Sequence, residues 1–398
     1  MKILLVNKFY YPRGGDCMAM LAQEELFRSK GHEVAIFSMS HPENIPSEWD
    51  SYFAPEITFS GKGIIGRWKA LRRIFGIGAV KRSFIRLLND FHPDVVHLHN
   101  IHSYLSPVLA KLAHQRGCKV FWTMHDYKLV CPIYTCLSRG HTCERCFNDK
   151  SALLSRRCMK NSYGATLIAY LENRYWNIRK VEKWVDQFIA PSMFMYDRLV
   201  AGGVSEDKIT VLTNFVHSSA EIIPPEERED YGCYVGRLSY EKGLEQMLVE
   251  ASSLDINLRI AGEGDLLEPL RKKYESEHIR FIGKLSRQEV SSLLSHARFS
   301  MVPSIWYENA PLSLIESLCA GTPVLGSSMG GIPELIDDQE NGLLFSKGVG
   351  LEMEEKLQQI SQPNNGFDSR SIALKARQRF SPETYYQQII TLYEQTQR

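Results

Sequence analysis

The chain has 398 residues, of which 44% are hydrophobic and 23% charged, and its formal net charge is +1. This length exceeds one ordinary hydrophobic core, so two domains are expected. A near-neutral charge excludes a global field that steers nucleic acid to the surface. No apolar run approaches the roughly 18–20 residues that cross a bilayer, and residues 1–7 resemble a strand rather than a signal peptide. We therefore expect a cytoplasmic protein with no nucleic-acid partner.

Short apolar runs alternate with helical patterns through the first half of the chain. The turn-rich residues 12–15 lead into a helix with apolar side chains at helical spacing, which Gly31 ends. Continuous apolar strands separated by helices indicate a parallel sheet covered on both faces. The strands expected in this half are 2–6, 33–38, 94–98, 119–123, 187–190 and 208–212.

The same alternation restarts near residue 231, after a polar segment at 218–229 that suits a linker. Its expected strands are 231–235, 257–261, 280–282, 300–303 and 323–326. The pattern predicts an α/β fold with two doubly wound, Rossmann-like domains. We assign 1–215 to the first domain, with a cysteine-rich insert at 131–158, and 216–380 to the second. A last helix within 381–398 is expected to pack back on the first domain.

The segment from Glu308 to Glu316 holds two carboxylates eight residues apart. Pro311 suits the first turn of a short helix, and Gly321 suits a left-handed stop after it. With Glu308 before this helix and Glu316 inside it, the carboxylates would lie about 10–12 Å apart along its axis. One could then hold a sugar and the other a ribose, with phosphates at the helix N-terminus between them. The alternative is a pair of solvated glutamates.

Glycines and basic residues follow the predicted strands of the second domain, at the edge where doubly wound sheets bind ligands. Arg237 and Lys242 would suit a diphosphate, because a fork-shaped guanidinium and a compact ammonium supply positive charge and donors. Gly264 allows a ligand close to the backbone, and Gly330 and Gly331 precede a short helix that offers N–H groups. An ordinary solvated loop and a tight turn are the alternatives.

Histidines end two strands of the first domain. His125 could donate to a sugar hydroxyl or a phosphate, although a structural histidine is the alternative. His97 and His99 flank Leu98, and we expect them on opposite faces of their strand, so that at most one reaches a ligand.

Five of the nine cysteines lie between residues 131 and 158. Cys143 and Cys146 have the two-residue spacing of zinc sites, and Cys131 and Cys158 could complete four thiolates, leaving Cys136 over. Such a site would be structural, because four thiolates leave no open position for water. Reduced, buried cysteines are the alternative.

Residues 62–88 hold eight Lys or Arg and no acidic residue, with apolar side chains interleaved at helical spacing. This pattern suits contact with an anionic bilayer surface, at the inner face of the cytoplasmic membrane. The alternative is a helix whose apolar stripe joins the core. The relevant apolar residues are Trp68, Leu71, Ile74 and Phe75.

Together these motifs resemble the family-4 glycosyltransferases of the GT-B fold, in which two Rossmann-like domains face a central cleft. The resemblance rests on ordered motifs along nearly the whole chain: the loop at 14–15, Gly236-Arg237 with Lys242-Gly243, 262–264, the Glu308–Glu316 pair, 330–334 and 341–345. The segment 125–132, with Cys143 and Cys146, is similar to a bacterial subgroup that builds capsule, lipopolysaccharide O-antigen or exopolysaccharide.

The resemblance implies a retaining hexosyltransferase with a nucleotide-sugar donor, UDP- or GDP-linked, and a saccharide or lipid-linked saccharide acceptor. It implies no cofactor for catalysis, and the chain has no Asp-x-Asp that would hold a divalent ion. Arg237 and Lys242 would bind the diphosphate, Glu308 the transferred sugar and Glu316 the ribose. The family pattern also assigns the donor phosphate to the backbone after Glu308 (Asn309, Ala310 and Leu312), the donor sugar to His125, and the phosphates or acceptor to Gly15, with Gly264 also in the donor site.

Two other functions fit parts of the same pattern. A nucleotide-sugar epimerase of similar fold would bind the same diphosphate and need no acceptor. A protein that binds nucleotide sugars without catalysis would keep the binding residues alone. The ordered set of motifs favours the transferase.

Overall fold

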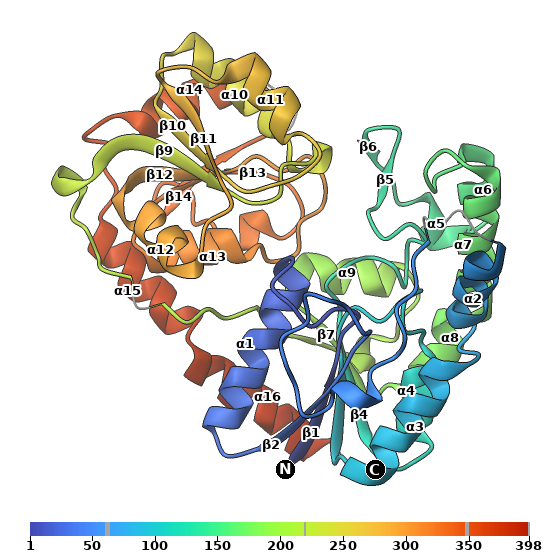
Figure 1. The fold of residues 1–398 in the computed structure, drawn as a ribbon. Helices are drawn as coiled ribbons and strands as arrows, with labels where there is room; N and C mark the ends of the chain where they lie inside the picture. The colour runs from blue at the N-terminus through green and yellow to red at the C-terminus, as the bar shows by residue number, and fades with distance from the viewer. Residues whose placement is uncertain (60–63, 219, 347–349, 397–398) are drawn as a thin grey trace. The chain divides into compact units, whose positions relative to one another are not determined.

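The computed structural model describes residues 1–59, 64–218, 220–346 and 350–396. The chain divides into two compact units (Figure 1): unit 1 comprises Met1–Leu212 with Tyr386–Arg398, and unit 2 comprises Thr213–Tyr385. In the described residues, no helix is both long and apolar enough to cross a membrane.

Unit 1 is built on a six-stranded sheet in the order β2-β1-β3-β4-β7-β8, and every pair of neighbours is parallel. The central strands are continuous apolar runs, and Ile3, Leu4, Leu5 and Val6 are fully buried, as expected of a sheet covered on both faces. The strands are β1 (Lys2–Val6), β2 (Glu33–Phe37), β3 (Val95–Leu98), β4 (Lys119–Thr123), β7 (Gln187–Ala190) and β8 (Ile209–Val211).

Helices follow most of these strands, and the chain between β4 and β7 adds an insert with the antiparallel hairpin β5 (Leu137–Ser138) and β6 (His141–Thr142). The helices of unit 1 are α1 (Gly15–Ser29), α2 (Ile64–Ile74), α3 (Ala79–Phe91), α4 (Val108–His114), α5 (Arg145–Asn148), α6 (Ala152–Arg156), α7 (Tyr163–Tyr175), α8 (Ile178–Val181) and α9 (Met193–Ala201).

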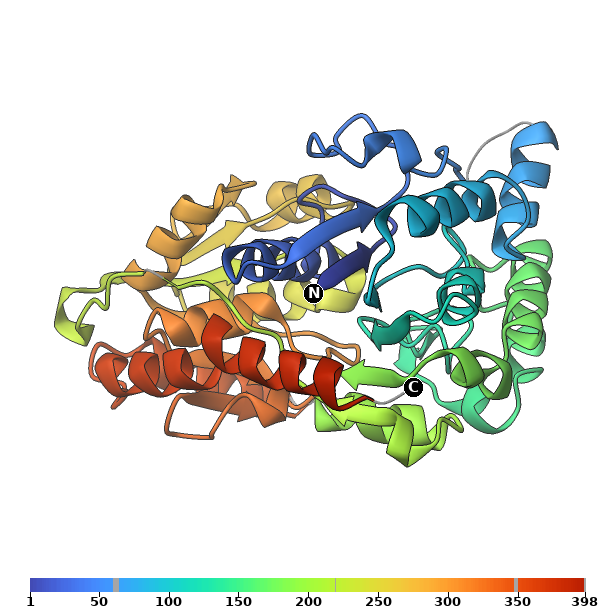
Figure 2. The same ribbon diagram turned by 90° about the horizontal axis from the view of Figure 1, so that it is seen from below.

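The last helix, α16 (Pro382–Gln395), packs on the sheet of unit 1 (Figure 2). The ring of Tyr393 lies 4.6 Å from that of Phe121 on β4 and 6.0 Å from that of Phe27 on α1. Lys119 donates to the carbonyl oxygen of Tyr393 at 2.8 Å. These contacts bury one face of α16 against residues from the first third of the chain.

Unit 2 repeats the architecture with the order β11-β10-β9-β12-β13-β14, again parallel throughout. The two sheets confirm the predicted fold class. The strands are β9 (Glu229–Val235), β10 (Leu258–Ala261), β11 (Ile279–Gly283), β12 (Ala297–Val302), β13 (Val324–Ser327) and β14 (Gly342–Phe345). The helices are α10 (Leu244–Ser253), α11 (Leu267–Tyr274), α12 (Arg287–His296), α13 (Leu312–Cys319), α14 (Gly350–Ser361) and α15 (Ser369–Arg379).

Helix α13 ends as predicted but begins one residue later than expected. Gly321 has a φ of +77°, in the left-handed region, directly after the C-cap residue Ala320. Pro311 is the N-cap residue with an extended backbone (φ −65°, ψ 123°), not a residue of the first turn. Because the backbone of Pro311 is extended, the helical conformation starts at the next residue, Leu312.

Helices α2 and α3 cover the basic stretch that the sequence assigned to a membrane surface. Lys62 lies outside the described residues. The apolar stripe of α2 largely joins the protein interior, since Ile74 is buried while Leu71 and Phe75 are partly buried. Only Trp68 of the four predicted contact residues is mainly exposed, at 62%. Of these four residues, Ile74 fits the alternative of an inward-packed stripe, Leu71 and Phe75 fit it in part, and Trp68 does not.

Candidate active site

Each sheet has one point where its strand order reverses, and polar side chains follow the strands there. In unit 1 the reversal falls between β1 and β3, and in unit 2 between β9 and β12. Crossovers from these neighbouring strands leave in opposite directions, so ligands of doubly wound sheets bind beyond their carboxyl ends. The loops after these four strands are therefore the places where a site is expected in each unit.

In unit 2, Glu308 lies in the loop between β12 and α13 and is 7% exposed. Its Oε1 atom accepts hydrogen bonds from Lys242 Nζ at 2.6 Å, Ser304 Oγ at 2.6 Å and Trp306 Nε1 at 2.7 Å. Burial alone would raise the pKa of Glu308, but the charge of Lys242 and these three donors outweigh burial and lower it below its ordinary value. Glu308 is therefore an ionised carboxylate at neutral pH, and it accepts hydrogen bonds only.

The backbone at Glu308 is fixed by the glycine pair after β13. Gly331 N–H donates to the carbonyl oxygen of Glu308 at 2.7 Å. Gly330 has a φ of +64°, and a Cβ atom there would lie 2.1 Å from the same oxygen. Only glycine allows this approach. Gly331, whose N–H group was predicted to face a ligand, thus donates it to the loop of Glu308 in this structure.

The predicted diphosphate residues differ in their surroundings. The side chain of Arg237 is 63% exposed, with Nη1 3.9 Å from Glu241 Oε1, whereas the ammonium of Lys242 is engaged by Glu308. Gly264 has a φ of +154°, and a Cβ atom there would lie 2.2 Å from the carbonyl oxygen of Leu238. The close packing of the loop at Gly264 against Leu238 therefore requires glycine at this position even when no ligand is bound. This agrees with the alternative of a tight turn.

The remaining predicted donor residues line the start of α13. Ala310 is buried, and its carbonyl oxygen accepts from Asn214 Nδ2 at 3.0 Å. Asn309 and Leu312 are half-buried beside it. Burial raises the pKa of Glu316 to about 7, although the guanidinium of Arg287 opposes the shift. Glu308 is thus ionised by its donors, while Glu316 can hold a proton close to neutral pH.

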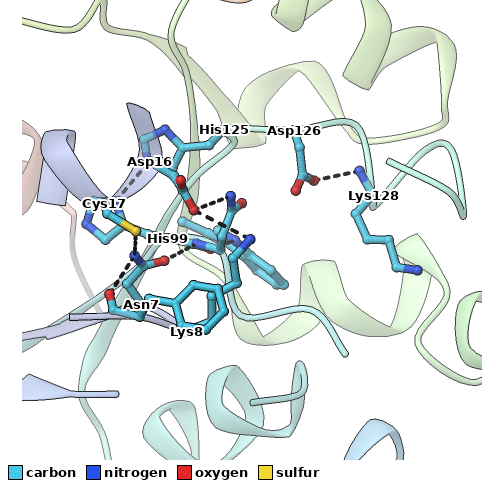
Figure 3. A network of polar contacts seen from close by, with 11 residues as sticks. Asn7, Lys8, Asp16, Cys17, His99, His125, Asp126 and Lys128 are labelled. Carbon is cyan, nitrogen blue, oxygen red and sulfur yellow. Dashed lines mark hydrogen bonds and ion pairs between the residues drawn. The ribbon is translucent and has the colours of Figure 1, made fainter. Parts of the chain in front are cut away.

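A second polar cluster follows β1 and β3 in unit 1 (Figure 3). The carboxylate of Asp16, in the first turn of α1, lies 3.5 Å from Lys8 Nζ and accepts from Asn100 Nδ2 at 2.8 Å. Asn100 N–H in turn donates to Asn7 Oδ1 at 3.1 Å. Burial alone would raise the pKa of Asp16, but Lys8, His125 and the bond from Asn100 lower it to about 2.

His125 lies in the same cluster and forms a hydrogen bond with a second histidine. His99 Nδ1 and His125 Nε2 are 2.8 Å apart, and their rings stack at 5.1 Å. Burial lowers the pKa of His125 to about 4, with Asp16 opposing and Lys8 adding to the shift. His125 is therefore neutral at neutral pH, and its Nε2 atom is engaged by His99.

The prediction that His97 and His99 take opposite strand faces is wrong. Their rings stack at 4.7 Å with an interplanar angle of 7°, because residues two apart in a strand share a face. His97 Nε2 lies 2.7 Å from Thr123 Oγ1, and His97 Nδ1 contacts the hydroxyl of Tyr393 on α16. A row of three imidazoles thus runs from α16 to His125.

Gly15, the other predicted site residue of unit 1, begins α1 and is exposed. A Cβ atom there would meet no atom within 4 Å, so packing does not explain this glycine. Asp126, beside His125, has its pKa raised by burial, although Lys8 opposes the shift.

The sequence interpretation missed Lys8, Asp16 and Asn100 as members of the unit 1 cluster. Each is a common polar residue near a strand end or helix start, and only the strand order brings them together. The rule that ligands bind at the reversal of strand order could have selected them, had the order been known.

The four predicted zinc ligands do not form a metal site in this structure. Across the ranges that the structure describes, no three or more His, Cys, Asp or Glu side chains are arranged to hold a metal ion. Cys131 is instead hydrogen-bonded to the leftover Cys136, which lowers the pKa of Cys131, and Cys158 Sγ lies 3.9 Å from Ser138 Oγ. Cys143 and Cys146 are free thiols. The alternative of reduced cysteines describes this geometry.

Comparison with known proteins agrees with the two-unit architecture. Residues 22–219 match the model of Glycosyltransferase Family 4, and residues 218–387 match that of Glycosyl transferases group 1. Together the two matches span nearly the whole chain. The protein therefore belongs to the family-4, group 1 glycosyltransferases of the GT-B fold, and it is a glycosyltransferase that uses a nucleotide-sugar donor.

Individual relatives are distant. The chain is 26% identical over 353 residues to an uncharacterised 42.6 kDa protein of the cps region of Klebsiella pneumoniae, covering 84% of this chain and 87% of that protein. It is 26% identical over 178 residues to an uncharacterised glycosyltransferase of Methanocaldococcus jannaschii, covering 44% of this chain and 49% of that protein. The structure of Anabaena HepE with UDP and glucose superposes with a TM-score of 0.70 at 14% identity, covering 99% of this chain and 100% of HepE.

Proposed function

We propose that the protein is a retaining glycosyltransferase that moves a hexose from a UDP- or GDP-sugar to a saccharide or lipid-linked saccharide acceptor. The observation that carries this proposal is the buried, ionised Glu308 held by Lys242 at the reversal of strand order in unit 2. The likeness to a protein of the Klebsiella cps region over 84% of the chain favours capsule, O-antigen or exopolysaccharide synthesis.

In this proposal Glu308 contacts the transferred sugar, because an ionised carboxylate accepts hydrogen bonds from sugar hydroxyls. Arg237 and Lys242 bind the diphosphate, and their charge offsets the charge that develops on it as it leaves. The donor would compete with Glu308 for Lys242, so binding would rearrange the 2.6 Å pair. The exposed Arg237 is the first positive group that an incoming diphosphate meets.

The start of α13 serves the rest of the donor. The backbone of Asn309, Ala310 and Leu312 meets the phosphate, where N–H groups of a helix start face an anion. Glu316 binds the ribose hydroxyls, and its raised pKa allows it to donate as well as accept near neutral pH. Gly264 packs beside these loops and contacts the donor through its backbone.

His125 in unit 1 contacts the donor sugar, and Gly15 the phosphates or the acceptor. A neutral His125 can donate one hydrogen bond without repelling a cationic neighbour. Its contact with His99 at 2.8 Å holds the ring in place.

The transfer breaks the bond between the anomeric carbon and the phosphate oxygen, and the electron pair leaves with the diphosphate. The acceptor hydroxyl forms the new bond on the same face and gives its proton to the departing phosphate oxygen. This course retains the anomeric configuration. The residues named here bind, orient and neutralise charge, and none of them forms a covalent intermediate.

A thermal-shift screen tests donor binding. Because a ligand that binds only the folded state stabilises it by about 2.7 kcal/mol at one hundred times its Kd, a true donor should raise the melting temperature by several degrees. The screen would use UDP-, GDP-, ADP- and TDP-linked sugars, each against its free nucleotide. No shift with any of them would contradict the proposal.

Two further measurements separate the alternatives. An epimerase would isomerise the donor with no acceptor present, which NMR of the nucleotide sugar would detect. A non-catalytic binding protein would give equal, background transfer in wild type and in the variants Glu308→Gln and His125→Ala. We expect neither outcome.

A further inference from the structure

Helix α7 (Tyr163–Tyr175) has its apolar face outward and its polar face inward. Large apolar side chains on the outward face are 38–60% exposed, in a helix where such residues normally pack inside. Their spacing of four residues aligns them along one side. The exposed residues are Tyr163, Leu167, Ile168, Leu171 and Tyr175.

The inward face of α7 is fixed by specific polar contacts. Glu172 is 4% exposed, lies 3.1 Å from Lys128 Nζ and accepts from Ser103 Oγ at 2.8 Å. Asn173 Nδ2 donates to the carbonyl oxygen of Leu129 at 3.3 Å. Rotating the helix to bury its apolar face would separate this buried ion pair and leave a buried charge without its partner, which is strongly unfavourable. The polar contacts of the inward face therefore determine that the apolar face of α7 points outward.

Helix α2 lies beside α7 (Figure 1), and contacts at the end of α2 join the two helices. The rings of Phe75 and Tyr175 meet edge to face at 5.1 Å, and Trp176 Nε1 donates to the carbonyl oxygen of Ile74 at 2.7 Å. Trp68 on α2 is 62% exposed. We call the exposed residues of α7 together with Trp68 the α7 surface.

Positive charge flanks the α7 surface. The guanidinium of Arg157 lies 4.1 Å from the ring of Tyr163, and Lys180 Nζ lies 3.9 Å from the ring of Tyr175, so a cation stands at each end of α7. Residues 64–88 and 150–183 together hold 15 Lys or Arg and 2 Asp or Glu, in a chain with 47 basic and 46 acidic residues. The rest of the chain is therefore net negative.

We propose that the α7 surface docks on an anionic lipid bilayer. Leucine and isoleucine side chains would enter the interface, while Tyr and Trp lie at headgroup depth and basic groups meet lipid phosphates. Charge complementarity selects this occupant: in a symmetric contact with a second copy, the same basic segments would face each other. The placement also differs from the sequence interpretation, because the insertion face is α7 and not the stripe of α2.

Vesicle flotation of the full-length protein tests the contribution of the apolar side chains to membrane binding. The vesicles would be phosphatidylcholine alone or with about 30 mol % phosphatidylglycerol. We expect the double variant Leu167→Gln/Leu171→Gln to lower binding to the anionic vesicles about tenfold, because two leucines no longer gain apolar burial. Gln has a helix propensity close to that of Leu, so α7 should persist. The matched control, Leu351→Gln/Leu374→Gln, changes two exposed leucines of unit 2 and should bind as wild type does.

A second pair of variants tests the contribution of the basic side chains to membrane binding. Lys69→Gln/Arg72→Gln should lower binding about thirtyfold, at about 1 kcal/mol per basic residue near an anionic surface. Lys272→Gln/Arg280→Gln, two exposed basic positions of unit 2, is the control and should have no effect. About 1 M salt should weaken wild-type binding, because it shortens the screening length to about 3 Å.

Equal binding of wild type and Leu167→Gln/Leu171→Gln, or equal recovery with neutral and anionic vesicles, would overturn the proposal. A wild-type dimer that the same variant converts to a monomer would assign the surface to a second copy and also overturn it. The assay uses no sugar donor, so its failure is separate from a failure of the proposed transfer activity.

Discussion

Both units place a lysine–carboxylate pair at the reversal of their strand order, but the two pairs are built differently. In unit 2, Lys242 donates directly to Glu308 at 2.6 Å, and two neutral donors reach the same oxygen. In unit 1, Lys8 lies 3.5 Å from Asp16, whose shorter contact is with Asn100. Three short hydrogen bonds thus fix the position of the Glu308 carboxylate. The low pKa of Asp16 depends more on the charges of its neighbours.

The two geometries suit the two carboxylates to different roles. Glu308 is held rigidly from several loops, which suits a group that must meet a sugar in one orientation. Asp16 and Lys8 instead set the local potential around His125, raising and lowering its pKa respectively. The first pair is suited to contact and the second to charge balance.

The largest expected effect tests the contact role. Glu308→Gln should lower kcat by about a hundredfold or more with little change in donor KM, because it removes the charge that we propose to face the reacting sugar. Steady-state kinetics would measure both constants, with Glu355→Gln, an exposed glutamate of α14, as the control. If only KM rose, Glu308 would be a binding residue like Glu316, and the distinction between the two would fail.

Asp16→Asn tests the charge-balance role. Leaving Lys8 without its partner should lower the free energy of unfolding by about 3 kcal/mol at neutral pH. The folded pKa of about 2 lies below the ordinary 3.8, so this stability is present above about pH 4 and is lost as pH falls toward 2. Denaturant unfolding between pH 7 and 3 should therefore show the wild type approaching the variant at low pH.

Asp265→Asn, an exposed aspartate of unit 2, is the control for that series and should track the wild type throughout. Parallel curves for the wild type and Asp16→Asn would mean that the pKa of Asp16 does not shift on folding.

Glu316→Gln should weaken donor binding about tenfold while leaving kcat near the wild-type value. The reason is the loss of hydrogen bonds to the ribose by a group proposed to lie away from the chemistry. Calorimetric titration with the donor found in the thermal screen would measure it. A large fall in kcat with unchanged affinity would reverse the roles of the two glutamates.

The smallest effect concerns the contact of α16 with the imidazole row. Tyr393→Phe removes the hydroxyl that contacts His97 and should cost about 1 kcal/mol of stability, a few degrees in melting temperature. Tyr134→Phe, at a half-exposed ring, is the control. A wild-type melting temperature in Tyr393→Phe would show that packing of the ring alone holds α16 there.

Much of the fold was predictable because strands and helices are local patterns. The strands from Lys2–Val6 to Val324–Ser327 lie within about three residues of their predicted bounds, since continuous apolar runs between helices identify buried parallel strands. Glycines required by the backbone, such as Gly321, were also visible in the sequence. The positions of Glu308 before α13 and of Glu316 inside it were predictable for the same reason, because the helix signals are local.

The sequence by itself therefore determined the α/β class, the paired sheets and the family, all of which depend on order and spacing along the chain. The tertiary structure decided the rest: that Lys242 pairs with Glu308, that His97, His99 and His125 form one row, and that the five insert cysteines form no metal site among the described residues. It also decided that α7 carries a row of exposed apolar side chains, with Trp68 of α2 exposed as well. These depend on which strands are neighbours and which way a helix is turned, and contacts between distant segments fix both.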